Sequence, residues 1–177
     1  MKQYKFWETC MKMIEEGKVI ESEKYGIEIA KKLGLGQELL DKIFSVNLKS
    51  YEKNIDSKMT ECIERAKTEN AEALCLYYSM DNGWDSTIYF CKNYTHKNSS
   101  WIGASRSWLD IGKARGFSGI YKKEAESAFF CDNISSAICL LLMLRTTIAF
   151  YNVAKNYKDC GLKLCITGTE SDFVRVV

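Results

Sequence analysis

The sequence predicts an α+β domain. About four N-terminal helices precede a mostly antiparallel sheet, and the sheet packs on one long buried helix, residues 134–157. Apolar residues recur at helical spacing through residues 1–70. From residue 73 onward, segments rich in β-branched and aromatic residues flank an Asn-Gly turn. Residues 134–154 then contain a single charge, Arg145, and no Gly or Pro. Helices followed by strands in this order are typical of the α+β class.

Helical spacing defines the first 70 residues. Residues 3–16 predict a helix that stops at Gly17, residues 21–33 a second that ends at Gly34, and residues 37–46 a short third. A fourth helix has the clearest pattern, because its apolar residues step by three or four between charged ones. These residues are Leu48, Tyr51, Ile55, Met59, Cys62, Ile63 and Ala66. We therefore expect one face of this helix to lie on an apolar surface.

Strand signals begin at Ala73. Residues 73–80 and 84–94 predict two strands joined by a turn at 81–83. Residues 95–119 are polar and rich in Gly and Ser, so we expect an irregular segment with a strand near Trp101. Residues 127–132 predict another strand and Asn133 the N-cap of the long helix. After Gly161 we expect a terminal hairpin around Thr169–Ser171. A strand, a helix and a strand in this order permit a right-handed crossover.

The long apolar helix has two interpretations, a membrane span or a core helix. A span needs about 20 mostly apolar residues, and 134–154 is long enough. However, the unbroken apolar run covers only 137–144, and Arg145 near the middle would cost about 2.5–3.5 kcal/mol in a membrane. At helical spacing, one narrow stripe of the helix surface holds Arg145, Asn152 and Asn156. We predict a core helix whose first half is enclosed by protein and whose stripe meets water or a partner, with no membrane.

Composition indicates one globular domain, 1–177, with a helical segment 1–70 and a sheet and core helix in 71–177. The net charge of +2 is too small for a nucleic-acid footprint. The eight cysteines form no C-x-x-C pair and mostly have apolar neighbours, which predicts reduced thiols in the cytoplasm. We read no signal peptide, and we predict no metal site and no cofactor.

Candidate catalytic residues are few. His96 is the only histidine and lies in a polar loop, and no G-x-S-x-G elbow exists. Asp81 and Asp85 flank the hairpin turn, where paired carboxylates can act in acid–base chemistry or simply cap the turn. Arg145 either reaches the surface or is buried, in which case it needs a carboxylate; Asp132, Asp159 and Glu126 are possible partners. A buried arginine in a pocket would suit an anionic ligand.

Residues 101–123 are the best candidate binding segment, because basic side chains alternate there with Trp101, Trp108 and other aromatic residues. Such a pattern would let nucleic-acid bases stack on the aromatic side chains while the basic side chains contact the phosphates. Tryptophans also anchor protein interfaces, or pin a surface loop to the core. The candidate binding residues are Trp84, Asp85, Trp101, Arg106, Trp108, Arg115 and Arg145.

Together these observations favour a non-catalytic cytosolic protein that binds another protein through the hairpin turn and residues 95–119, because no catalytic motif or nucleotide loop is present. A small bacterial toxin-neutralising protein of the immunity type would fit this profile. The first alternative is an enzyme or small-ligand protein with a pocket near Arg145 or Asp81/Asp85. The second is weak nucleic-acid binding through 101–123. Formation of a homo-oligomer is left open.

Overall fold

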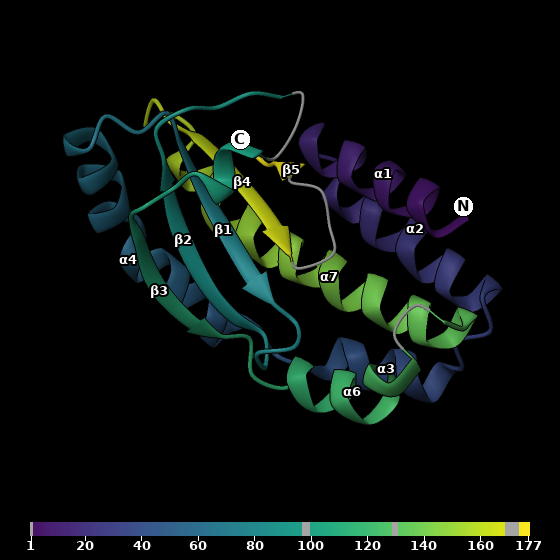
Figure 1. The fold of residues 1–177 in the computed structure, drawn as a ribbon. Coiled ribbons are helices and arrows are strands. Elements are labelled where there is room, and N and C mark those ends of the chain that lie inside the picture. Colours follow the sequence, from purple (N-terminus) through teal and green to yellow (C-terminus); the bar gives the residue numbers. More distant parts are fainter. Residues whose placement is uncertain (1, 97–99, 129–130, 169–173) are drawn as a thin grey trace. The chain divides into compact units, whose positions relative to one another are not determined.

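The computed structural model describes residues 2–96, 100–128, 131–168 and 174–177 and has the α+β class that the sequence predicts (Figure 1). Its contacts divide the chain into two units, each made of two segments. Residues 1–48 and 115–148 form the first unit, and residues 49–114 and 149–177 form the second. The fourth helix therefore belongs with the sheet and not with the helices that precede it. That the whole chain acts as a single domain stays a prediction.

Helices build the first unit. They are α1 (Lys2–Glu15), α2 (Val19–Lys32), α3 (Gln37–Ser45), α6 (Phe117–Glu124) and the part of α7 up to residue 148. The three helices expected before residue 47 are confirmed, with ends within two residues. Ser22 Oγ donates a hydrogen bond of 3.0 Å to the Cys10 carbonyl and joins α2 to α1. At Gly26 of α2 an added Cβ would lie 2.6 Å from Leu144 Cδ2, so glycine permits the close approach of these helices.

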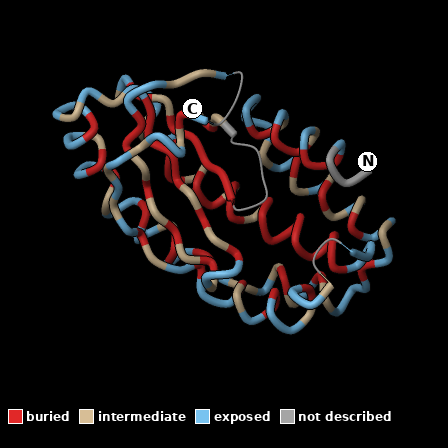
Figure 2. Tube along the Cα trace, in the orientation of Figure 1, coloured by how far each residue is buried: buried red, intermediate tan, exposed pale blue. Residues whose placement is uncertain are grey.

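Helix α7 (Asn133–Ala154) continues into the 3₁₀ turn η2 (Lys155–Tyr157). Residues 137–144 are each at most 3% exposed, which confirms that the first half is enclosed (Figure 2). Arg145 and Asn152 are half-buried and Asn156 is exposed, as the stripe predicts. By length and composition α7 could cross a membrane, but 78% of its apolar window is buried inside the protein. Such burial agrees with the core helix that the sequence predicts.

The segment before α7 corrects two predictions. The described residues of 127–132 do not form a strand: Glu126–Ala128 is a 3₁₀ turn, η1, and Cys131 N donates to the Ala128 carbonyl over 2.8 Å in a further turn. Residues 129 and 130 lie outside the described residues. The cap of α7 is Asp132 rather than Asn133, because the Asp132 carboxylate accepts the Ser135 N–H at 2.8 Å. The expected crossover therefore does not begin from this segment.

A five-stranded sheet dominates the second unit, in the order β3-β2-β1-β4-β5. Its strands are β1 (Ala73–Ser79), β2 (Asp85–Cys91), β3 (Trp108–Lys113), β4 (Lys163–Gly168) and β5 (Val174–Arg175). β1 pairs parallel with β4, and the other three pairs are antiparallel, so the sheet is mostly antiparallel as predicted. The turn expected around Thr169–Ser171 lies outside the described residues.

The strand expected near Trp101 is wrong. Trp101 lies in the short helix α5 (Ser100–Gly103), and the strand of this region is β3, which begins at Trp108. The Trp101 indole is buried and its Nε1 donates to the Thr95 carbonyl at 3.0 Å. The tryptophan therefore holds the α5 turn by its side chain, while backbone pairing with β2 begins several residues later.

Helix α4 (Lys49–Thr68) packs on this sheet, as its amphipathic pattern predicts. Its expected apolar face is buried except for Ile63, which is half-buried. Tyr51 and Ser86 share a 2.6 Å hydrogen bond between their hydroxyls, which joins α4 to β2. The last turns of α7 are tied to α4 as well, because Asn152 Nδ2 donates to Glu52 Oε1 at 3.1 Å.

Candidate binding surface on the sheet

The two faces of the sheet differ because side chains alternate along each strand. On β2, Ser86, Ile88 and Phe90 are buried on the face that α4 covers, with Ser86 bonded to Tyr51 and Phe90 beneath the Arg65 guanidinium at 4.7 Å. Thr87 and Tyr89 point to the opposite face and are only half-buried. We call this opposite side the open face. In Figure 1, α4 lies behind the sheet and strands β1, β2 and β3 are in front.

One end of the open face is closed by α5. Trp101 packs there in a buried cluster with Ala73, Cys75, Cys91 and Cys165, which come from three neighbouring strands. Burial raises the pKa of Cys91 to about 12 and that of Cys75 well above its usual range. These thiols therefore stay protonated and serve as small apolar side chains under the indole.

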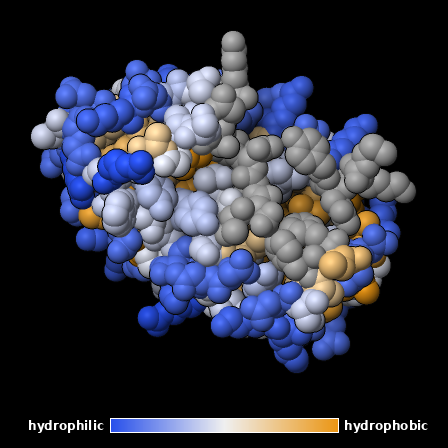
Figure 3. All heavy atoms as spheres, in the orientation of Figure 1, coloured by the Kyte–Doolittle hydropathy of each residue, from blue (hydrophilic) through white to orange (hydrophobic). Residues whose placement is uncertain are grey.

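Beyond this cluster an aromatic row crosses three strands of the open face. Tyr77 on β1 and Tyr89 on β2 meet with ring centroids 6.2 Å apart, and Tyr89 meets Trp108 on β3 at 6.5 Å. Trp108 lies directly opposite Tyr89 in the register and is 53% exposed. Figure 3 shows atoms of intermediate hydropathy over these strands, bordered by hydrophilic ones. The aromatic row (Tyr77, Tyr89, Trp108) thus offers rigid, partly accessible rings.

Carboxylates adjoin the aromatic row. Asp110 follows Trp108 by two residues on β3, is exposed, and accepts a 3.2 Å hydrogen bond from Thr87 Oγ1. Asp85, at the start of β2, is half-buried. Because side chains alternate along the strand, it lies on the same face as Thr87 and Tyr89. The open face therefore combines aromatic rings with two carboxylates on β2 and β3, and Lys113 lies opposite Asp85 in the register.

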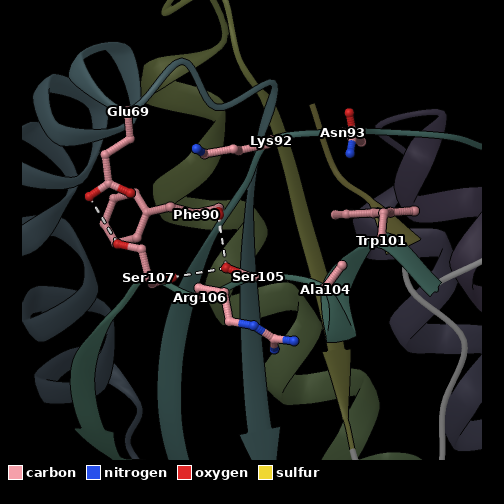
Figure 4. Close-up of a pocket in the computed structure, with 9 residues that line it drawn as sticks. All are labelled: Glu69, Phe90, Lys92, Asn93, Trp101, Ala104, Ser105, Arg106 and Ser107. Atoms are coloured by element: carbon pink, nitrogen blue, oxygen red, sulfur yellow. Dashed lines mark hydrogen bonds between the residues drawn. The ribbon is translucent and has the colours of Figure 1, made fainter.

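A cavity of about 430 Å³ lies at the far end of β2, where α4 ends and the segment between α5 and β3 passes (Figure 4). Its walls come from three separate parts of the sequence. They are Glu69, then Phe90, Lys92 and Asn93, then Trp101, Ala104, Ser105, Arg106 and Ser107. Ser105 Oγ donates to the Phe90 carbonyl at 2.8 Å and fixes the third wall to the second.

The site residues predicted from the sequence differ in exposure: some lie on the surface and others are buried. Trp108 and Arg106 are exposed, on the aromatic row and at the cavity. Trp101 is 6% exposed and Trp84 is fully buried, stacked on Tyr78 at 6.0 Å. Both indoles therefore pack in the protein and offer no exposed ring. Trp84 also has a φ of 63°, a conformation rare for a bulky residue, and its burial compensates for this strain.

The other two arginines among the candidate binding residues are Arg115 and Arg145. Both lie in the first unit, apart in sequence from the sheet. Arg115 is exposed just before α6. Arg145 is half-buried and donates to the carbonyls of Ile43 and Val46, with Val46 at 3.0 Å. Its partners thus include the carbonyl end of α3. Asp132, one of the carboxylates expected beside it, begins the same helix, and 13 residues at about 1.5 Å each separate the two by roughly 20 Å. Glu126 and Asp159, the other two, are exposed.

The structure assembles no familiar catalytic group from the other candidates. His96 is exposed and its Nδ1 is 2.9 Å from the Tyr94 hydroxyl. Asp81 is exposed on the hairpin turn and Asp85 accepts the Ser86 N–H at 3.2 Å. Among the described residues no group of three His, Cys, Asp or Glu side chains could hold a metal ion. The cavity lining includes none of Asp81, Asp85 and Arg145.

Comparison of the chain with protein families, curated proteins and solved structures finds no match. The candidate site is therefore defined by its own geometry. Sequence reasoning missed Tyr77 and Tyr89, because apolar side chains occur on both faces of β1 and β2 and alternation does not tell the faces apart. The polar residues Thr87 and Asp110, which pair in the register, lie on the open face.

Proposed function

We propose that this chain is a non-catalytic cytosolic protein that binds another protein through the open face of its sheet, with Trp108 as the central anchor. Its partner presents an apolar patch bordered by Lys or Arg side chains, which would meet the carboxylates of Asp110 and Asp85. The toxin-neutralising role expected from the sequence is one form of this function.

The observation that carries the proposal is the exposure of Trp108. A tryptophan that is 53% exposed leaves a large apolar ring in water, although its backbone is fixed in β3 and its ring touches Tyr89. Such a ring is already ordered, so binding loses little side-chain entropy. Tryptophan and tyrosine are the residues that most often dominate the energy of protein interfaces.

Charge favours a protein over a nucleic acid as the partner. The segments of the second unit hold 13 Lys and Arg against 12 Asp and Glu, so they carry no marked positive charge. Asp110 and Asp85 lie beside the aromatic row and would repel a phosphate backbone. The same carboxylates would attract basic side chains at the rim of a protein interface.

Thiol chemistry gives no support to a catalytic role. Burial raises the pKa of Cys10 to about 12 and that of Cys62 to about 11, as it does for Cys91. A cysteine nucleophile needs the opposite shift, toward the thiolate. These cysteines therefore suit packing, and the reduced cytosol is the compartment in which such free thiols persist.

Photo-crosslinking in the native host tests the proposal. A photoreactive phenylalanine analogue at Lys113, exposed at the end of β3, should capture one protein repeatedly. The Trp108→Ala change should abolish that product. Ile20→Ala is the matched control, since Ile20 is 67% exposed on α2 and should leave the product unchanged. Crosslinks that survive Trp108→Ala, or that Ile20→Ala removes equally, would contradict the proposal.

A further inference from the structure

Four side chains of the open face lie together, two on β2 and two on β3. The register places Trp108 opposite Tyr89 and Asp110 opposite Thr87. Residues two apart on a strand point to the same face and are separated by about 7 Å, at roughly 3.3 Å per residue. We call these four residues the paired patch. An aromatic ring and a carboxylate of the paired patch are therefore within reach of one side chain of a partner.

The ring of Trp108 is accessible and stands on a fixed backbone. β3 is an edge strand of the sheet (Figure 1), and the ring is 53% exposed although its centroid lies 6.5 Å from that of Tyr89. Arg65 on α4 fixes the start of β3, since its Nη1 donates to the Trp108 carbonyl at 3.3 Å and its Nη2 to Ser107 Oγ at 2.7 Å. A flat group could therefore stack on the indole without first ordering the strand.

The Asp110 carboxylate is oriented but not neutralised. It is exposed, accepts the 3.2 Å hydrogen bond from Thr87 Oγ1, and makes no ion pair with any described residue. Lys113, the nearest cation along β3, lies opposite Asp85 in the register. Burial raises the pKa of the Tyr89 hydroxyl and the charge of Asp110 raises it further, so this carboxylate is close enough to act on the aromatic pair. The paired patch therefore has an open negative charge beside an open ring.

Arginine is the side chain whose chemistry matches both halves of the paired patch. Its guanidinium is flat and cationic, so it stacks on an aromatic face, and its fork of N–H donors contacts both oxygens of a carboxylate. Tryptophan is the ring that attracts cations most strongly. A lysine ammonium is a compact, strongly hydrated point charge that neither stacks nor makes the two-point contact. A difference between arginine and lysine is therefore the signature of this arrangement.

We propose that the central contact of the partner is an arginine, whose guanidinium stacks on the Trp108 ring and pairs with both oxygens of Asp110. The inference rests on the proposed function, because it names the side chain that the open face recognises in that partner. It moves a basic group from the border of the interface to the anchor itself. Thr87 and Tyr89 are positioning residues, since Thr87 holds the carboxylate and Tyr89 supports the indole.

Selection from a displayed library of random peptides, with the full chain as the target, tests the inference. Peptides that bind wild type but not Trp108→Ala should share an arginine at one position, flanked by apolar residues. In a synthetic copy of such a peptide, lysine in place of this arginine should weaken binding to wild type by about fivefold or more. With Asp110→Asn the two peptides should differ by less than about twofold, because the carboxylate that distinguishes them is gone.

The matched control removes a carboxylate from the other side of the sheet. Glu64 is exposed on α4, the helix that covers the opposite face, and its pairing with the partner is not expected. Glu64→Gln should therefore keep the full difference between the arginine and lysine peptides, within about twofold.

The outcomes distinguish this inference from the proposed function. Peptides that need Trp108 but share no arginine, or that bind equally well with lysine in its place, overturn the inference and leave protein binding through the open face intact. Loss of the arginine preference in Glu64→Gln as well as in Asp110→Asn also overturns it, because the effect would then come from net charge. If no selected peptide depends on Trp108, the proposed function and the inference fail together.

Discussion

Replacement of Arg145 by methionine should lower the free energy of unfolding by about 2–4 kcal/mol. The Arg145 guanidinium donates to the carbonyls of Ile43 and Val46 at the C-terminal end of α3, where Ile43 also accepts the Val46 N–H at 3.4 Å. It also lies over the Phe44 ring at 5.0 Å and the Phe117 ring at 5.5 Å. The change removes all four contacts, and methionine fills most of the vacated volume.

The magnitude follows from these contacts. A hydrogen bond that involves a charged group contributes about 1.5–3 kcal/mol, and the low end applies because Arg145 is half-buried. Each ring contact adds about 0.5 kcal/mol at such a site. Methionine recovers part of this by apolar burial, which gives the expected range of about 2–4 kcal/mol.

Urea denaturation followed by far-ultraviolet circular dichroism measures this change. Arg145→Lys should retain about half of the stabilisation, because one ammonium keeps the charge but cannot match the planar fork to two carbonyls. Lys122→Met, an exposed change on α6, is the control and should stay within about 0.5 kcal/mol of wild type. An Arg145→Met protein that also stays within about 0.5 kcal/mol would refute the reasoning.

Three further outcomes are expected. Gly168→Ala should destabilise the protein by about 2 kcal/mol or more in the same assay, because its Cβ would lie 2.5 Å from a Tyr78 ring carbon; an unchanged midpoint would contradict that packing. Asp132→Ala should lower stability near pH 7 and by progressively less in acid, since bonds to the start of α7 depress the pKa of Asp132 and its contribution shrinks as pH falls below the ordinary aspartate pKa and through the depressed one; a difference that does not shrink in acid would exclude this linkage. Maleimide should label exposed Cys131 first and half-buried Cys160 more slowly, and the other six thiols only in denaturant, as mass spectrometry would detect; early labelling of those six would disprove their burial.

Much of the fold could be predicted because its helices carry strong periodic signals. Helix α4 alternates charged and apolar residues clearly, and α7 is too apolar to be a surface helix. The strand expected at 127–132 was wrong because a short apolar segment has no period of its own, and Asp132 was needed to cap the next helix. Local patterns also could not show that α4 belongs with the sheet, which depends on contacts distant in sequence.

The candidate site was only partly predictable. Trp108 and Arg106 stood out by composition, but the burial of Trp84 and Trp101 depends on tertiary packing that an indole in a polar segment does not reveal. The cavity combines residues from the end of α4, the end of β2 and the segment before β3. Lys92 in particular has no unusual neighbours in sequence, so only the fold identifies it.

The affinity of the chain for the partner captured at Lys113 tests the central claim most directly. Titration calorimetry with that purified partner should show that Trp108→Ala weakens binding by about 30-fold, which corresponds to the roughly 2 kcal/mol expected of an anchor residue. Ile20→Ala should leave the dissociation constant within about twofold. A Trp108→Ala protein that binds the partner as tightly as wild type would contradict the claim that the open face of the sheet is the binding surface.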